Sequence, residues 1–157
     1  MQIDWTFQEF NSLSPQELYE ILYLRISVFM IEQKCLYSEC DNNDQVAYHL
    51  CGRNNGKLAL YARVIPPNIY YHGETKNLSR IGRVVTSPDY RRKKLGHKLI
   101  QKAIDATHKK FPDTNITLSA QTHLRSFYES HGFSINSEEF IEDGIPHIKM
   151  IRNQKCA

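Results

Sequence analysis

Long hydrophobic runs are missing from this chain of 157 residues, and its mean hydropathy is −0.52. No apolar stretch approaches the roughly 20 residues that a helix needs to cross a bilayer, so we expect no membrane-spanning helix. The opening residues, MQIDWTFQEF, also lack the positive start and the apolar segment of a secretory signal. We therefore expect a cytoplasmic protein that does not associate with membranes.

Cysteine is scarce, and its spacing is irregular. In the cytoplasm we expect Cys35, Cys40, Cys51 and Cys156 to be reduced thiols. The first three lie near His49 in the sequence, which raises the possibility of a metal site. The C-x-x-C spacing that is typical of structural zinc sites is absent. The pattern favours buried or loop thiols, and we expect no bound metal.

Excess charge of one sign is also small. The formal net charge is +3, with 24% charged and 41% hydrophobic residues. This composition is typical of a globular protein rather than a disordered one. The length fits a single domain, residues 1–157, with a sizeable core. A dedicated nucleic-acid-binding domain would spread a basic excess over a whole face, so we expect no nucleic-acid partner.

Several local patterns predict secondary structure. Ser14 and Glu17 form a capping box around Pro15, which predicts a helix from Ser14 to about Phe29. The sequence NNGK predicts a hairpin turn between two strands, and Gly132 is placed to end a helix. Two further helices are expected from Leu95 to before Pro112 and at His123–His131. The expected strands are Ile3–Phe7, Val46–Arg53, Leu58–Ile65, Leu78–Thr86, Ile116–Ala120, Ser137–Glu142 and His147–Ile151.

The order of these elements indicates the fold class. The segment Leu78–Ala120 is a strand–helix–strand unit, which implies a parallel pair of strands with a right-handed crossover. The remaining strands follow one another closely, as antiparallel strands do. We therefore expect an α/β fold with a mixed, largely antiparallel sheet flanked by helices and a central parallel strand–helix–strand unit.

A run of four basic residues, Arg91–Lys94, precedes the crossover helix. Unpaired backbone N–H groups and the positive end of the helix dipole meet at a helix N-terminus, which favours anions. Gly96 has no side chain, so it lets a ligand approach the first turn closely. On its own, such a run is usually a solvated surface. At this position it favours a site for a pyrophosphate.

Two stretches resemble the motifs of the GNAT acyltransferases, the Gcn5-related N-acetyltransferase superfamily. Motif A has the pattern Q/R-x-x-G-x-G/A, and Arg91 and Gly96 match its ends, while Lys94 replaces its first glycine. Leu118–Phe133 resembles motif B. The sequence is also similar to the ElaA-like branch of the superfamily at Leu24–Asp44 and Glu142–Ile148.

The resemblance implies an N-acetyltransferase that uses acetyl-CoA as co-substrate and acylates a primary amine of a small molecule or peptide. It places Tyr128 beside the coenzyme sulfur as the general acid, and it makes Glu32 and His147 the candidates for the general base. It implies that backbone and side chains of eleven residues bind the coenzyme: Val84, Val85, Thr86, Arg91, Arg92, Lys93, Lys94, Leu95, Gly96, His97 and Gln121. If Phe127 faces the core, its neighbour Tyr128 can face the cleft.

Alternatives stay open at this point. The basic run with Tyr70, Tyr71 and Tyr90 could belong to a nucleic-acid-binding module, although these tyrosines do not share one expected strand. A GNAT-fold protein that binds coenzyme A without catalysis is another possibility. Three acidic loop residues would, together with Glu32, favour a cationic acceptor if they line the cleft: Glu39, Asp41 and Asp44.

Overall fold

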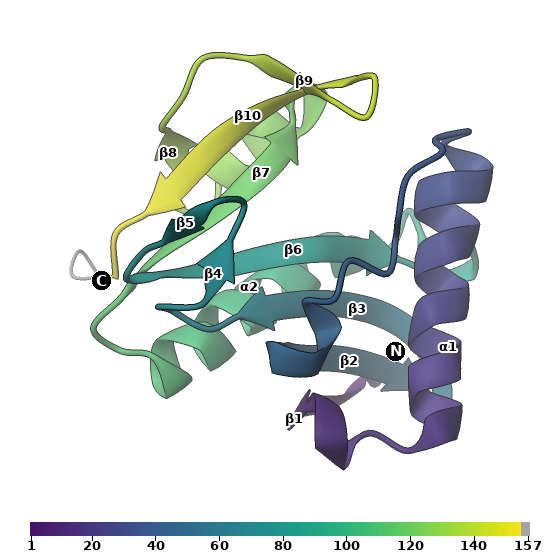
Figure 1. Ribbon diagram of the computed structural model, residues 1–157. Helices are drawn as coiled ribbons and strands as arrows, with labels where there is room; N and C mark the ends of the chain where they lie inside the picture. Colours follow the sequence, from purple (N-terminus) through teal and green to yellow (C-terminus); the bar gives the residue numbers. More distant parts are fainter. Residues whose placement is uncertain (155–157) are drawn as a thin grey trace.

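An eight-stranded mixed sheet forms the centre of the computed structural model (Figure 1), which describes residues 1–154 apart from the side chain of Glu74. Cys156 lies outside the described residues. Strand β9 (Phe140–Glu142) pairs with β10 beside the main path of the sheet. The order along that path is β1 (Asp4–Glu9), β2 (Tyr48–Asn54), β3 (Lys57–Ile65), β6 (Leu78–Thr86), β7 (Asn115–Gln121), β10 (Ile145–Arg152) and β8 (Ser134–Ile135).

Only β6 and β7 pair in parallel; every other pair of this sheet in the described residues is antiparallel. The crossover between β6 and β7 contains helix α2 (Leu95–Lys110). The expected mixed sheet with one parallel strand–helix–strand unit is thus confirmed.

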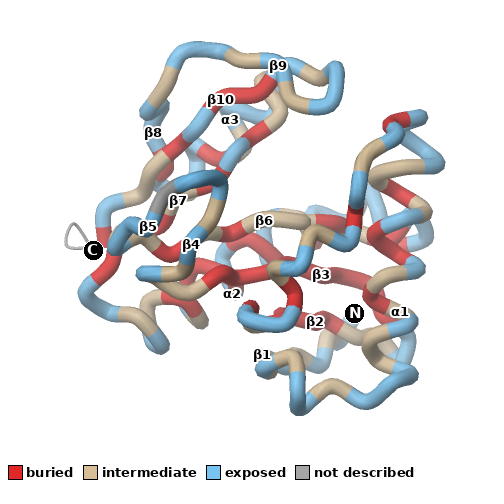
Figure 2. The backbone as a smooth tube through the Cα atoms, viewed as in Figure 1, coloured by how far each residue is buried: buried red, intermediate tan, exposed pale blue. Residues whose placement is uncertain are grey.

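Two hydrophobic cores cover the two faces of the sheet. Helix α1 (Pro15–Arg25) packs Ile21 and Leu24 against Tyr61 and Val85 on one face. Helix α2 covers the other face with Leu99, Ile100 and Ile104, among others. Burial of one such side chain stabilises the fold by about 1.5–3 kcal/mol. Buried residues concentrate in β3 and in the central part of the sheet (Figure 2).

The start of α1 follows the sequence closely, but its end does not. The N–H of Glu17 donates to Ser14 Oγ at 3.1 Å, and the N–H of Ser14 donates to Glu17 Oε2 at 2.8 Å, so the capping box is confirmed. Beyond Arg25 the chain continues as a π-helical segment, η2 (Ile26–Glu32). The expected end at Phe29 is therefore wrong by three residues. Wide helical turns of this kind are rare and occur frequently at functional sites.

Turn residues account for other boundaries. Asn55 and Gly56 link β2 and β3 with φ of 50° and 78°, as a type I′ hairpin turn requires. Gly132 has φ of 85° and ends the helical segment before it, as expected. Among the described residues, no helix is long and apolar enough to span a membrane.

Three expectations need correction. The loop after β3 contains a small hairpin, β4 (Tyr70–Tyr71) with β5 (Glu74–Thr75). The helix expected at His123–His131 is a 3-10 turn, η5 (Thr122–Leu124), followed by the short helix α3 (Arg125–Glu129). The strand expected at Ser137–Glu142 is only β9, and the two-residue strand β8 was not expected. Such short elements carry too few residues to show a periodic pattern.

Candidate functional site

Strands β6 and β7 start together and then separate. They pair only from Leu78 with Asn115 to Arg80 with Thr117, and β7 rises away from β6 beyond that point (Figure 1). Strand β6 nevertheless continues to Thr86, where it pairs with β3 on its other side. Among the described residues, its backbone groups that face β7 therefore have no strand partner along this stretch, and an extended ligand could pair with them.

A β-bulge lies in the same stretch of β6. Arg83 and Val84 together oppose the single residue Ala62 of β3, and Arg83 has φ of 51°. A positive φ in a residue with a side chain is unfavourable and is found repeatedly at functional sites. The bulge reverses the alternation of β6, so Val84 packs toward the α2 side and Val85 toward the α1 side. The expected coenzyme strand Val84–Thr86 therefore begins at a distortion.

The basic run lies in the loop that enters α2. Arg91, Arg92, Lys93 and Lys94 are all exposed, and no side chain caps the first turn of the helix. Lys94 has φ of 57°, in the left-handed region that favours glycine. This explains the departure from motif A, because lysine here takes the backbone conformation of the usual glycine while its side chain points to solvent. The uncapped N–H groups remain available to an anion.

Gly96 stands in the first turn of α2, close to α3. A Cβ atom at this position would lie 3.8 Å from the ring of Phe127 and 4.0 Å from Thr86 Oγ1, which are ordinary contacts. The folded chain itself therefore does not require glycine at position 96. What the missing side chain leaves open is the approach to the helix N-terminus.

Tyr128 is more deeply buried than its neighbour Phe127. Tyr128 is only 7% exposed and packs edge-on against Phe133, whereas Phe127 is half-buried and lies against His97. The Tyr128 hydroxyl has no hydrogen-bond partner among the described residues. Burial raises the pKa of Tyr128 to about 12, so the hydroxyl keeps its proton at neutral pH.

Two residues at the end of η2 contact the two sides of the opening between β6 and β7. Glu32 Oε1 lies 2.8 Å from Arg91 Nη1 in the loop before α2. Gln121 Nε2, at the end of β7, donates to Gln33 Oε1 at 3.3 Å. Glu32 and its neighbour Gln33 thus link the end of η2 to both sides of the opening. The predicted residues Glu32, Arg91 and Gln121 therefore lie together at the entrance, or mouth, of the opening between β6 and β7.

His147 lies beside this mouth, because it pairs with Gln121 in the register of β10 and β7. Its Nδ1 lies 2.7 Å from the carbonyl oxygen of Ile145, which can only accept a hydrogen bond. Nδ1 therefore carries a proton, and Nε2 is free to take one. The carboxylate of Glu142 lies 3.5 Å from Nε2.

The acidic loop does not offer free negative charge to an acceptor. Glu39 and Asp44 are buried and bind Arg25 at 2.6 and 2.8 Å. Asp41 binds Arg63 at 2.7 Å, and Arg83 reaches Glu39 at 2.9 Å. The idea that these three carboxylates attract a cationic amine is therefore wrong. Their role is to tie the loop after η2 to strands β3 and β6.

The sequence raised a metal site at the cysteines near His49 as an alternative, but no bound metal was expected. Within residues 1–154, no group of three or more potential ligands is close enough to hold a metal ion. His49 is buried, with Nδ1 2.7 Å from the hydroxyl of Tyr61 and Nε2 2.9 Å from the carbonyl oxygen of Asp44. Cys35, Cys40 and Cys51 are free thiols, as expected.

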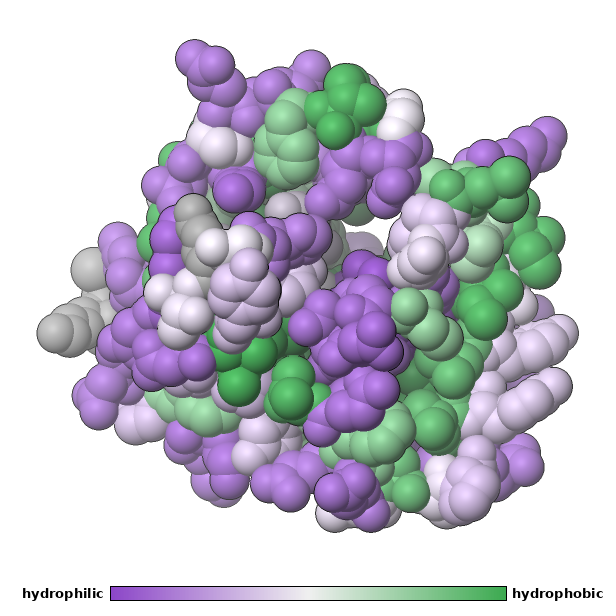
Figure 3. Space-filling view, in the orientation of Figure 1, coloured by the Kyte–Doolittle hydropathy of each residue, from purple (hydrophilic) through white to green (hydrophobic). Residues whose placement is uncertain are grey.

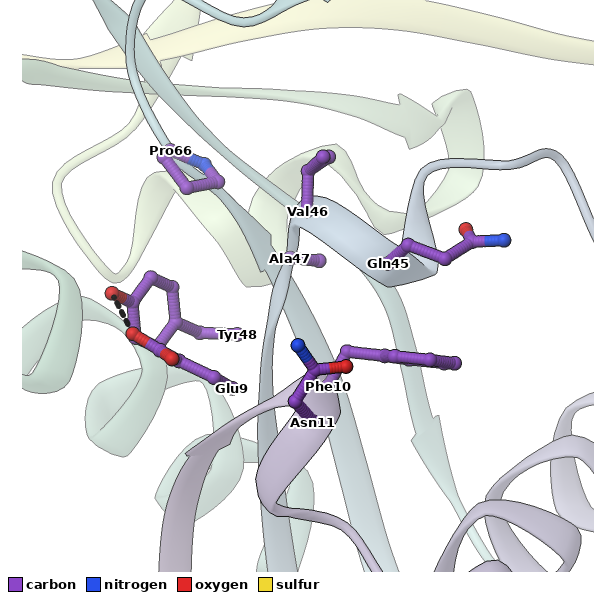
Figure 4. Close-up of a pocket in the computed structure, with 8 residues that line it drawn as sticks. All are labelled: Glu9, Phe10, Asn11, Gln45, Val46, Ala47, Tyr48 and Pro66. Carbon is purple, nitrogen blue, oxygen red and sulfur yellow. Dashed lines mark hydrogen bonds between the residues drawn. The ribbon is translucent and has the colours of Figure 1, made fainter.

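The tyrosines of the nucleic-acid alternative lie in different settings. Tyr90 is buried, Tyr71 is half-buried, and Tyr70 is exposed on the β4–β5 hairpin. A shallow pocket elsewhere, at the end of β1, contains none of the predicted site residues (Figure 4). It is lined by Glu9, Phe10, Asn11, Gln45, Val46, Ala47, Tyr48 and Pro66.

The fold agrees with the comparisons to known proteins. Residues 14–153 match the family model described as an acetyltransferase (GNAT) domain. The chain belongs to the GNAT acetyltransferase family. Its homologues over nearly the full length include a UPF0039 protein of Schizosaccharomyces pombe, with 42% identity over 94% of this chain and 95% of the relative. Protein ElaA of Escherichia coli is 37% identical over 96% of both chains.

Solved structures give the same result. An acyl-CoA N-acyltransferase from Pseudomonas aeruginosa superimposes with a TM-score of 0.88 at 40% identity, covering 97% of this chain and all of that one. The crystal structure of Escherichia coli ElaA gives 0.87 at 36% identity, with the same coverage. The resemblance to the ElaA-like branch of the GNAT superfamily is thus confirmed.

In this GNAT domain, two arginines of β6 at or near its separation from β7 were not predicted from the sequence, Arg80 and Arg83. Arg83 lies at the bulge, and the only sequence signal for the bulge is the loss of alternation in Arg83–Val84–Val85. Arg80 lies where β6 and β7 part, and a sequence alone does not reveal where two paired strands separate.

Proposed function

We propose that this protein is a cytoplasmic N-acyltransferase that transfers an acyl group, acetyl in the first place, from a coenzyme A thioester to a primary amine. The amine attacks the thioester directly, without a covalent enzyme intermediate. The observation that carries the proposal is the opening between β6 and β7, which leads to the uncapped N-terminus of α2. The membership of the GNAT family supports the use of an acyl-CoA.

Each part of the opening has a role in this proposal. The backbone of Val84–Thr86 has no strand partner on the β7 side among the described residues and would bind the pantetheine arm as an added strand. The first turn of α2 at Leu95–His97 and the cations of Arg91–Lys94 would hold the pyrophosphate. A backbone N–H near Val85 would stabilise the negative charge that develops on the thioester oxygen. Gln121 would border the arm from the β7 side.

Arg91 couples the coenzyme site to a candidate base. In the structure its guanidinium is paired with Glu32 at 2.8 Å, and both side chains are about 40% exposed. A pyrophosphate would compete for the same cation and so release the Glu32 carboxylate at the mouth. Glu32 would then be free to accept the proton of the amine, directly or through water.

Tyr128 is the proposed general acid for the departing thiolate. Its raised pKa keeps it protonated, and its hydroxyl has no competing partner among the described residues. Tyr128→Phe keeps the ring and its packing while removing the proton. Since general acid catalysis is typically worth about 10²–10⁴-fold, turnover should fall by that factor, with acetyl-CoA affinity retained.

The test is an acceptor screen with acetyl-CoA that follows release of free thiol, combined with calorimetry of coenzyme binding. Tyr48→Phe is a suitable control, because it removes the hydroxyl of a tyrosine that bonds Glu9 at a pocket without any predicted site residue. Turnover of Tyr128→Phe equal to that of the wild type at saturating substrates would assign Tyr128 to packing alone. Coenzyme binding without turnover of any acceptor would favour a binding protein over an enzyme.

The reaction also needs a general base, and Glu32 and His147 are the two candidates. A lysine-like amine has a pKa of about 10.4, so it must lose a proton before it attacks. We expect either Glu32→Gln or His147→Ala to flatten the acidic limb of the pH–rate profile, measured with an identified acceptor. If both variants keep the wild-type limb, the amine loses its proton to solvent before it binds.

A further inference from the structure

Arg80 differs from the other arginines on its side of the sheet. Arg25, Arg63 and Arg83 each bind at least one carboxylate of the loop after η2. The guanidinium of Arg80 instead lies over the ring of Tyr71, at 5.1 Å from its centroid. Its Nη1 is buried and has no hydrogen-bond partner among the described residues. An unpaired buried donor is costly, and structures rarely keep one without a reason.

The position of Arg80 connects it to the proposed reaction. It is the last residue of β6 that pairs with β7, so it lies at the closed end of the opening. Arg80 pairs with Thr117 of β7, and the candidate base His147 pairs with Gln121 of the same strand. Thr117 and Gln121 are an even number of positions apart, so their side chains point to the same face of the sheet. Arg80 and His147 therefore lie on the same face of the sheet beside the opening.

The surface agrees with a site between these elements. The space-filling view is hollowed between the β9–β10 hairpin and the end of the α1 helix, and hydrophilic residues line much of the rim (Figure 3). Arg80 itself is half-buried. An acceptor that enters here meets a cation at one end and a proton acceptor at the other.

The charges of the region point to the missing partner. Three arginines and three carboxylates of the buried network balance each other: Arg25, Arg63 and Arg83 with Glu39, Asp41 and Asp44. Among the described side chains, none provides a carboxylate partner for Arg80. The planar guanidinium of Arg80, which lies over the ring of Tyr71, suits a carboxylate that binds through two oxygens.

We propose that the acceptor is an amine that carries a carboxylate, as a free amino acid does, and that Arg80 binds this carboxylate. The proposal rests on the proposed acyltransferase function and names its substrate class. In the reaction the amine nitrogen forms a bond to the acyl carbon and the carbon–sulfur bond breaks. The proton of the amine goes to the general base, and the thiolate takes a proton from Tyr128. Arg80 takes no part in these steps and acts by positioning the amine.

The experiment compares free L-amino acids with their carboxamides as acceptors of the wild-type protein and acetyl-CoA. The wild type should prefer the amino acid, through a lower KM. In Arg80→Gln the ratio of kcat/KM between amino acid and carboxamide should fall by about 10- to 100-fold, as the loss of a hydrogen bond to a charged group implies. Arg80→Lys should restore part of the ratio, because lysine keeps the charge but not the two-point geometry.

Arg53→Gln is the matched control, since Arg53 is also half-buried but binds Glu20, away from the opening. This variant should keep the wild-type ratio. Calorimetry with N-acetylglycine and its amide, in the presence of coenzyme A, gives a second measure that does not need turnover. The acid should bind more tightly to the wild type, and Arg80→Gln should remove the difference.

The outcomes separate the two proposals. If coenzyme A binds but amino acids and carboxamides are used or bound equally well, the carboxylate proposal is wrong and the acyltransferase function stands. An unchanged ratio in Arg80→Gln also overturns the role of Arg80. If neither coenzyme A nor acetyl-CoA binds to the folded protein, the proposed function itself is wrong, and the substrate class falls with it.

Discussion

Two groups of cationic residues lie in this protein, and they differ in what surrounds them. Arg25 and Arg63 are buried and held by carboxylates at 2.6–3.0 Å. The run Arg91–Lys94 is exposed, and among the described residues its only ion pair joins Arg91 to Glu32. The first group fixes a loop to the sheet. The second group is open to an anionic ligand.

The difference shows that a charge alone does not mark a binding site. Composition counts all of these residues equally, but burial and pairing decide which of them can bind a ligand. Breaking a buried ion pair leaves an uncompensated charge in the interior and is strongly destabilising. An exposed cation contributes little to stability, so its presence at the N-terminus of α2 needs another explanation.

The largest effect on stability should follow from Arg25→Met. This change removes the cation that Glu39 and Asp44 share with their neighbours and leaves two buried carboxylates without it. The free energy of unfolding should fall by about 3–5 kcal/mol, measured by urea denaturation. Arg53→Gln, which breaks a partly exposed pair, should cost less than about 1 kcal/mol. Equal losses in the two variants would contradict the distinction between buried and exposed charges.

A smaller effect should appear in acid. Burial alone would raise the pKa of Asp41, but the hydrogen bonds and charge of Arg63 outweigh it and hold the pKa well below its usual value. Asp44 behaves in the same way beside Arg25. A lowered pKa in the folded state stabilises the protein above the ordinary aspartate pKa of about 3.9. This stability should be lost as the pH falls below that value.

Urea midpoints between pH 5 and pH 3 test this expectation. Asp41→Asn should reduce the loss of stability in that range. Asp89→Asn should keep nearly all of it, because the Asp89 pair with Lys57 is exposed. If Asp41→Asn follows the wild-type curve, the buried network does not cause the loss of stability in acid.

Much of the fold could be predicted from the sequence because its signals are local. The capping box at Ser14 and the Asn55–Gly56 turn depend only on neighbouring residues, and both are confirmed. The π-helical end of the first helix could not be predicted, because it contacts a distant strand, as the hydrogen bond between Gln33 and Gln121 illustrates. The β4–β5 hairpin could not be predicted, because its two-residue strands are too short to show a periodic pattern.

The candidate site was predictable in part for the same reason. The motif residues from Arg91 to Gly96 form one continuous segment, so their spacing is visible in the sequence. The pairing of Asp41 with Arg63, or of Arg91 with Glu32, joins residues far apart in the chain. Residue types in a loop therefore suggested free acidic groups where the fold provides ion pairs.

The central claim is that the exposed basic loop and the first turn of α2 hold the coenzyme pyrophosphate. Gly96→Glu places a side chain and a negative charge at that point, and like charges brought together at a binding surface cost several kcal/mol. Gly96→Ala is the matched control, since a methyl group meets only ordinary contacts at 3.8 Å and beyond. Both variants should fold with near wild-type stability.

Calorimetry of acetyl-CoA binding to these two folded variants and the wild type is the most direct test. The account predicts that Gly96→Glu loses affinity by roughly 100-fold or more, in line with that repulsion, while Gly96→Ala stays closer to the wild type. Wild-type affinity in Gly96→Glu would contradict the account, because the pyrophosphate could then not lie against the N-terminus of α2.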